Sequence, residues 1–335
     1  MSLASLARAA WSDESGAGGV ALRTALLPAS ALFRAASRAH HKLYDAGVWT
    51  ATRGPIPVIS VGNLRVGGAG KTPFAAWVVH QLLAMGRRPA VLHGGYGSDE
   101  PELHRRWHPN VPVLVGRERI ESVHNAARQG RDVAVLDDGF QHRRLARDLD
   151  IVLLAAEHGA DRVHLLPRGP WREPLAALRR AGVVVVTRKT APRERADAVV
   201  AKVRDVMERR ALHAWIQPAG WTTLDGNVAT EPDGAVVALS STAEPESFHR
   251  TLSDLGLSLA SRLAFPDHHD YTEKDLARIE RDADGMTVVT TTKDAVKLAG
   301  LRGRVDVRVL EQRVIVEEGE AELVQRILAA VGAPA

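Results

Sequence analysis

The stretch VGNLRVGGAGKTPF, residues 61–74, decides the fold expected for this chain of 335 residues. A short β-branched run, IPVISV (56–61), precedes it, and a helix-length apolar run, TPFAAWVVHQLLAM (72–85), follows it. Strand, glycine-rich loop and helix in this order form the context of a phosphate-binding loop with the pattern G-x-x-x-x-G-K-[ST]. Arg65 stands where that pattern has its first glycine. The loop is therefore either a variant that still binds a nucleotide or a glycine turn with a surface lysine.

The glycines that phosphate binding needs come later in the same loop. Consecutive backbone N–H groups must point at the phosphates, and the N-terminus of the following helix must face them. We expect Lys71 to reach the β- and γ-phosphates and the Thr72 hydroxyl to hold Mg²⁺. The predicted nucleotide-binding residues are Gly67, Gly68, Ala69, Gly70, Lys71 and Thr72.

Two adjacent carboxylates, Asp137 and Asp138, follow the apolar run VAVL (133–136). Two such groups at a strand end repel each other unless a cation lies nearby, and a carboxylate at this place orients Mg²⁺ in phosphate-loop enzymes. A turn at Asp138-Gly139 is the alternative, but it does not account for Asp137. The predicted metal ligands are therefore Thr72, Asp137 and Asp138. The D-x-x-G pattern of GTPases fails, because Asp137 is followed by Asp138, Gly139 and Phe140. The [NT]-K-x-D pattern fails, because TKDA places Asp294 one position early, so ATP is the expected nucleotide.

Further apolar runs predict the rest of the architecture. Near-continuous Val, Ile and Leu runs separated by helical stretches are typical of a parallel sheet covered on both faces. We expect an α/β fold, with a phosphate-loop NTPase-like α/β/α core and a mainly parallel sheet, a smaller C-terminal α/β domain and an N-terminal amphipathic helix. The expected segments are an N-terminal membrane-docking segment (1–50), the kinase core (51–210), a hairpin linker (211–232) and the smaller domain (233–335).

The N-terminal segment is amphipathic when it is placed on a helical wheel. Pro28 suits a first helical turn, so the ordered helix is expected to begin near it. An apolar stripe opposite a basic face is typical of a helix lying on anionic lipid, and a helix packed on its own domain is the alternative. The stripe comprises Leu22, Leu26, Ala29, Leu32, Phe33, Ala36 and Leu43, and the basic face comprises Arg23, Arg34, Arg38 and Lys42.

Composition sets further bounds. The chain contains no cysteine, which excludes disulfides, thiolate zinc sites and cysteine nucleophiles. The formal net charge of +4 favours phosphate-bearing or anionic partners, although arginine-rich usage also follows from genomic base composition. No apolar run approaches the ~18–20 residues that span a bilayer, and Asp13 and Glu14 interrupt the first 20 residues, so we expect neither a membrane span nor a cleavable signal.

Five collinear motifs give the chain a family resemblance. They are VGNLRVGGAGKTP, LDDGFQHRRLARDLDIV, LLPRGPWREP, FPDHHDYTEKDL and TTKDAVKL. In this order they resemble the tetraacyldisaccharide 4'-kinase family over residues 20 to 330. The resemblance implies ATP- and Mg²⁺-dependent phosphorylation of the 4'-hydroxyl of tetraacyldisaccharide 1-phosphate, a lipid-linked acylated glucosamine disaccharide, in lipid A biosynthesis. It also implies a peripheral protein at the cytoplasmic face of the bacterial inner membrane, docked on the anionic surface by its N-terminal helix, with no nucleic acid partner.

The same resemblance implies roles for individual residues. Asp99 of SDEP and His268 of PDHH match an activating pair near the acceptor hydroxyl, with the adjacent His269 as the alternative partner. An aspartate oriented by a histidine is a reasonable proton acceptor. Arg172 and Glu173 of WREP match positions near the active site that contact substrate. Arg172 would screen phosphate charge or bind the 1-phosphate, which makes Asp99, His268, Lys71 and Arg172 the predicted catalytic residues.

The chain departs from the family pattern mainly on the acceptor side. SDEP follows GGYG directly, without the insertion that family members usually carry between them, and HGGYG stands where SRGYG is common. Two other functions therefore stay open at this point, namely a membrane-associated ATPase switch and a degenerate member that binds nucleotide without turnover. The motifs SDEP and PDHH favour the kinase over the switch, since a switch needs no acceptor-side pair.

Overall fold

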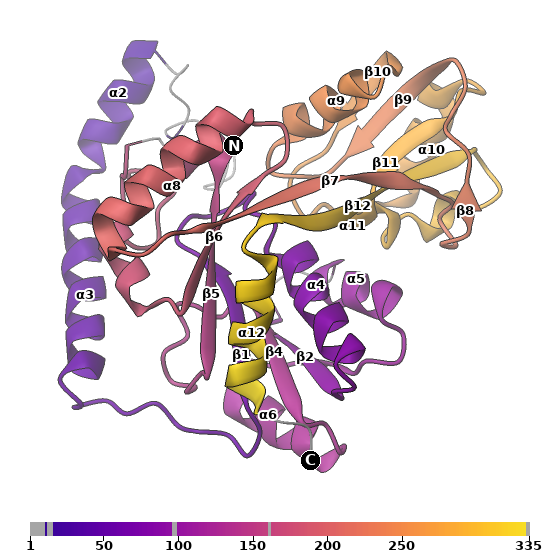
Figure 1. Cartoon of the computed structure of the whole chain (residues 1–335). Coiled ribbons are helices and arrows are strands. Elements are labelled where there is room, and N and C mark those ends of the chain that lie inside the picture. Colours follow the sequence, from indigo (N-terminus) through magenta and orange to yellow (C-terminus); the bar gives the residue numbers. More distant parts are fainter. Residues whose placement is uncertain (1–10, 12–15, 96–98, 160–161, 333–335) are drawn as a thin grey trace.

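A continuous twelve-stranded sheet runs through the whole protein (Figure 1). The computed structural model describes residues 11, 16–95, 99–159 and 162–332. The strand order is β10-β9-β11-β12-β7-β6-β5-β1-β4-β2-β3, and β8 pairs with β7. The first part of the N-terminal segment and the short stretch before Asp99 lie outside the described residues.

The half of the sheet that carries the phosphate loop is entirely parallel, which confirms the predicted fold class. Its strands are buried because each face is covered by helices. These strands are β1 (Val58–Asn63), β2 (Pro89–His93), β3 (Val113–Val115), β4 (Val133–Asp137), β5 (Leu149–Ala155) and β6 (Val183–Arg188).

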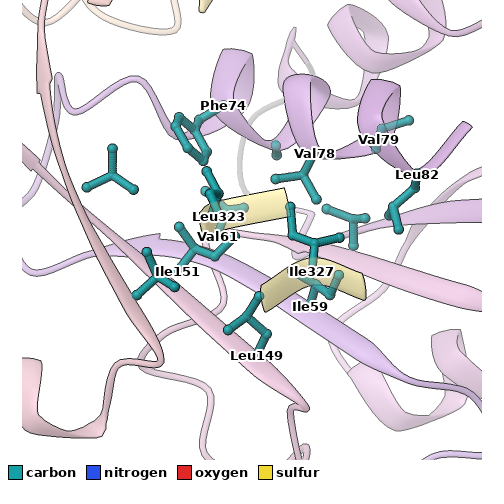
Figure 2. Packing of buried hydrophobic residues seen from close by; sticks show 14 of the residues in the cluster. Ile59, Val61, Phe74, Val78, Val79, Leu82, Leu149, Ile151, Leu323 and Ile327 are labelled. Carbon is teal, nitrogen blue, oxygen red and sulfur yellow. The ribbon is translucent and has the colours of Figure 1, made fainter. Parts of the chain in front are cut away.

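Alternate strand residues point to opposite faces, and each face buries its own apolar cluster. On one face, α4 (Lys71–Ala84) and α12 (Glu320–Val331) pack against β1 and β5, as Phe74, Val78, Leu323 and Ile327 show in Figure 2. On the other face lie α6 (Arg119–Arg128), α8 (Arg193–Met207) and the 3₁₀ helix η2 (Leu175–Arg180).

The smaller unit extends the same sheet. Its parallel strands are β9 (Ala235–Ser240), β10 (Ser258–Ala264) and β11 (Val288–Thr291). The helical elements of this unit are α9 (Pro245–Asp254), α10 (Glu273–Ala283), α11 (Thr292–Ala295) and η3 (Ala299–Leu301), while α5 (Asp99–Trp107) and α7 (Ala156–Gly159) follow core strands.

The connection between the two units differs from a simple hairpin linker. The predicted hairpin exists, since β7 (Leu212–Thr222) pairs with β8 (Val228–Ala229) around a turn at residues 223–227. However, β7 is also a central strand, parallel to β6 and antiparallel to the long β12 (Val307–Glu318). The predicted boundary at 233 also assigns residues 320–331 to the smaller unit, whereas α12 returns to the core because its apolar stripe is buried there. The division into domains therefore stays a prediction.

The N-terminal helices lie along the outer side of the core (Figure 1). Helix α2 (Gly16–Ala25) precedes α3 (Leu27–Asp45), so helical structure begins before Pro28, which occupies the first turn of α3. The Ser30 hydroxyl donates to the Leu165 carbonyl at 3.0 Å, and Phe33 packs on the core, whereas Leu32 is 72% exposed. The apolar stripe expected from the sequence therefore lies partly against the core, at Phe33, and is partly exposed, at Leu32. Within the described ranges, no helix combines the length and hydropathy of a membrane-spanning segment.

Candidate active site

The phosphate loop, residues 64–70, connects β1 to the first turn of α4. Gly67, Gly68 and Gly70 have φ angles of 89°, 51° and 74°, a region that L side chains rarely adopt. The Ala69 carbonyl accepts a 3.0 Å hydrogen bond from the Thr187 hydroxyl, which fastens the loop to the end of β6. The backbone freedom that the predicted loop requires is therefore used at all three glycines.

Arg65 lies outside the turn formed by these glycines. Its Nη1 is 3.7 Å from Glu244 Oε1, and the same carboxylate oxygen is 2.9 Å from His158 Nε2. Although burial raises the pKa of Glu244, the hydrogen bond with His158 and the nearby Lys189 and Arg65 lower it to about 2. Arg65 thus connects the loop to the smaller unit, a role that the sequence pattern did not indicate.

A group of charged side chains surrounds the mouth of the loop. Lys71 Nζ lies 3.7 Å from Asp138 Oδ1, and Arg172 Nη1 donates to both carboxylate oxygens of Asp138 at 2.9 and 3.0 Å. Arg172 and Lys71 of the phosphate loop thus contact the same carboxylate. Asp138, predicted as a metal ligand, contacts both of these cations, and its backbone has a φ of 58°.

Asp137 is 1% exposed and lies at the end of β4. Its Oδ2 is 3.1 Å from His104 Nε2, and its Oδ1 has no hydrogen-bond partner among the described residues. Burial raises the pKa of Asp137, but the His104 hydrogen bond and the charges of His104, His93 and Lys71 outweigh it and lower the pKa overall. The carboxylate is therefore held in its charged form.

The donor set at this position fits Mg²⁺. That ion takes one or two carboxylates, substrate phosphates and several waters instead of a closed protein cage. Thr72 is buried in the first turn of α4, and the orphaned Oδ1 of Asp137 is an oxygen ligand without a protein partner. In the described part of the chain no cluster of three or more His, Cys, Asp or Glu side chains suits a metal.

The acceptor-side residues meet between the two units. His268 Nδ1 lies 3.0 and 3.1 Å from the carboxylate oxygens of Asp99, which is 2% exposed at the start of α5. Lys293 and Lys297 reach the same carboxylate at 3.4 and 3.9 Å. Burial raises the pKa of Asp99, but the His268 hydrogen bond and the two ammonium groups hold it well below its usual range. The hydrogen bond with Asp99 raises the pKa of His268, partly opposed by burial.

The neighbouring histidine is engaged elsewhere. His269 Nε2 lies 3.1 Å from Asp275, the residue that completes the capping box of α10, and its ring stacks on Phe265. Of the two histidines in PDHH, the structure brings only His268 to Asp99. His268 also has a φ of 60°, an unfavourable backbone conformation of the kind that concentrates at functional sites.

Glu173, predicted to contact substrate, has several protein partners. Its carboxylate is buried and bonds His41 at 2.9 Å, Arg180 at 2.9 Å and the Gln141 amide at 3.0 Å. Burial raises the pKa of Glu173, but the His41 and Arg180 hydrogen bonds lower it to about 2. Through these contacts the carboxylate links His41 on α3 to Arg180 on η2.

Three further residues at the site were missed or underrated from the sequence. Lys293 has its place because the end of β11 meets α5, and His104 because α5 meets the end of β4. Lys189 follows β6. Burial lowers the pKa of Lys189, and the positive charges of Lys293 and Lys71 lower it further, whereas the carboxylates of Glu244 and Glu157 raise it. The signal that was available for the two lysines is that each follows an apolar run whose carboxyl end reaches the ligand-binding edge of a parallel sheet.

Comparisons with known proteins agree on one family. The family model described as tetraacyldisaccharide-1-P 4'-kinase matches residues 22–332. The tetraacyldisaccharide 4'-kinase of Anaeromyxobacter sp. (strain Fw109-5) is 42% identical over 96% of this chain and 95% of its own length. That of Anaeromyxobacter dehalogenans (strain 2CP-1) is 43% identical over 89% and 88%. A crystal structure of LpxK from Aquifex aeolicus in complex with ATP superposes with a TM-score of 0.73 and 29% identity, covering 93% of this chain and all of that one.

Proposed function

The chain belongs to the tetraacyldisaccharide-1-P 4'-kinase family, and we propose that its phosphate loop and its Asp99–His268 pair form the donor and acceptor sides of one active site. The protein is a kinase that uses ATP and Mg²⁺ to phosphorylate the 4'-hydroxyl of tetraacyldisaccharide 1-phosphate in lipid A biosynthesis. The observation that carries the site assignment is the contact of Asp99 with His268 across 169 residues of sequence.

On the donor side, the loop N–H groups and Lys71 bind the ATP phosphates, and Thr72 and Asp137 hold Mg²⁺. Bound Mg²⁺ neutralises phosphate charge and orients the phosphates. Arg172 adds positive charge beside Lys71, and its forked contact with Asp138 fixes its direction. Phosphoryl transfer needs mainly such positioning and charge neutralisation, and the cluster of cations at the loop mouth supports this assignment.

On the acceptor side, the Asp99–His268 pair takes the proton of the 4'-hydroxyl as its oxygen forms the bond to the γ-phosphorus and ADP leaves. Asp99 is ionised and fixed by His268 and by Lys293, so it is oriented before substrate arrives. Lys293 also offsets the negative charge that gathers when an anionic phosphoryl group approaches a carboxylate. The pair thus orients the acceptor hydroxyl and accepts its proton, while Lys293 offsets the negative charge of the approaching phosphoryl group.

The lipid substrate brings the membrane into the reaction. We propose that the protein is peripheral on the cytoplasmic face of the inner membrane and that the outer side of α2 and α3 lies on the lipid. This is supported by the exposed apolar side chains Val20, Leu27 and Leu32, and by Val48 and Trp49 just after α3.

Beyond the end of α3 a cavity of about 560 Å³ is lined by Trp49, Arg119, His142 and Arg144, among others, and its mixture of aromatic and basic groups suits a phosphorylated sugar.

The kinase assignment is tested with purified protein, Mg²⁺-ATP and tetraacyldisaccharide 1-phosphate, followed by mass spectrometry of the lipid. We expect a product heavier by one phosphate and none with Lys71→Ala. ATP hydrolysis without lipid product would instead support an ATPase switch.

The site assignment is tested separately by comparing turnover with ATP affinity. Asp99→Ala should lower turnover at least ~100-fold, the range of general acid–base contributions, with ATP affinity nearly unchanged. His269→Ala is the matched control for His268→Ala, because its ring packs at the α10 cap. Equal losses of turnover in the two histidine variants would refute the pair.

The membrane proposal has its own measurement. Deleting residues 1–45 should weaken sedimentation with vesicles of anionic phospholipid, because the apolar and basic side chains of α2 and α3 are lost together. Unchanged binding to these vesicles would exclude the helices as the docking surface.

A further inference from the structure

Helix α5 carries two functional contacts on opposite sides of the proposed reaction. Asp99, its first residue, meets His268 in the smaller unit, and His104, further along, meets Asp137 at the end of core strand β4. His104 is fully buried and Asp137 is 1% exposed. The proposed chemistry assigns Asp137 to Mg²⁺ but gives no role to His104, the buried histidine that contacts it.

The contact leaves the two oxygens of Asp137 in different states. A carboxylate only accepts hydrogen bonds, so the N–H at His104 Nε2 donates to Asp137 Oδ2, 3.1 Å away. Oδ1 lacks a partner in the described part of the protein. A buried carboxylate oxygen without a partner is costly, and that cost is removed when a cation binds. The histidine thereby fixes the rotamer of Asp137 and leaves one oxygen for the metal.

Helix α5 is itself held at both ends. At its start, Lys293 lies 3.4 Å from Asp99 in addition to the His268 contact. In its last turn, Arg106 donates to the Leu224 carbonyl at 2.9 Å and to the Thr222 hydroxyl at 3.1 Å, both in the β7–β8 hairpin. His104 is therefore presented to Asp137 from a helix whose position is fixed by the smaller unit and the hairpin.

We propose that His104 is a positioning residue that orients Asp137 for Mg²⁺ and, through α5, ties the metal site to the acceptor-side Asp99. This inference rests on the proposed role of Asp137 as a magnesium ligand. The competing explanation is that His104 only fills and satisfies the core. The two differ in one measurable respect, because a purely structural histidine affects stability but not the dependence of nucleotide binding on Mg²⁺.

The test measures binding of a fluorescent ATP analogue to the full-length protein as Mg²⁺ is titrated, with a parallel measurement in EDTA. In His104→Gln the side-chain amide reaches the place of Nε2 and keeps the donor to Asp137. In His104→Asn the amide reaches only the place of Nδ1, so polarity is kept but the contact is lost. His213→Leu is the control, since His213 is also buried and lies 3.6 Å from a carboxylate, that of Asp197 on α8.

We expect His104→Asn to raise the Mg²⁺ concentration at half-saturation about tenfold or more, the usual effect of removing a partner of a metal ligand. His104→Gln should stay within roughly threefold of the parent, and binding in EDTA should change in neither variant. His213→Leu should lower the melting temperature without moving the Mg²⁺ midpoint. Equal midpoints for the Gln and Asn variants would overturn the proposal.

The two hypotheses fail in distinguishable ways. If Asp137→Asn leaves the Mg²⁺ midpoint unchanged, the proposed metal site itself is wrong. If Asp137→Asn moves the midpoint but His104→Asn does not, the metal site stands and only the positioning role of His104 is refuted. Since the measurement follows nucleotide binding and needs no lipid acceptor, neither outcome depends on catalytic turnover.

Discussion

Replacing Gly70 with alanine should destabilise the protein by roughly 2–5 kcal/mol. Two contributions add up to this decrease in the free energy of unfolding. The backbone of Gly70 has φ 74°, which costs a non-glycine residue roughly 1–2 kcal/mol. A Cβ at this position would also overlap the Cδ1 of Ile216, a fully buried side chain on β7, and overpacking of that kind costs roughly 1–3 kcal/mol. Binding of ATP should weaken as well, because the loop is displaced.

The two contributions can be separated by urea unfolding of four variants. Gly86→Ala is the matched control, since Gly86 follows the end of the same helix with φ 73° and has open space around its Cα; it should lose only the backbone part. Ile216→Val removes the overlapping methyl, so the double variant with Gly70→Ala should recover about 1–3 kcal/mol relative to additivity. The reasoning is wrong if Gly70→Ala costs no more than Gly86→Ala, or if the two substitutions are additive.

Three other substitutions test the electrostatics. The hydrogen bond with Asp99 raises the pKa of His268 in the folded protein. The pair therefore stabilises the protein fully at acidic pH, and this stabilisation is lost as the pH rises through the pKa of His268 in the folded state. His268→Asn should accordingly lower the melting temperature more at pH 6 than at pH 9, and an equal decrease at both pH values would contradict the pairing. Glu173→Gln should speed amide exchange in α3 by weakening its contacts with His41 and Arg180, whereas unchanged exchange would separate Glu173 from that helix. Lys189→Met should weaken ATP binding severalfold, because it removes a positive charge near Lys71, while the exposed Lys274→Met should not.

The sequence by itself determined the parallel core and the glycine-rich loop, and it predicted the residues of the donor side. These are local properties, because β-branched runs followed by glycines and by Lys71-Thr72 specify strand, turn and helix within a few residues. The placement of Asp137 followed from the same rule, since strand ends of a parallel sheet gather at one edge. The family motifs predicted Asp99 and His268 as a pair, with His269 as the alternative partner, but only by resemblance, since 169 residues of sequence separate Asp99 from His268.

Only the tertiary structure decided which side chains meet across the chain. It brings His268 to Asp99 and His269 to Asp275, and it surrounds the Glu173 carboxylate with His41 and Arg180. It also makes one helix, α5, contact both His268 in the smaller unit and Asp137 in the core, and the long strands β7 and β12 join these two units in one sheet. The physical reason is that contacts between distant parts of the chain depend on how the buried faces of helices and strands pack together. Adjacent residues of a short motif therefore contact different parts of the protein.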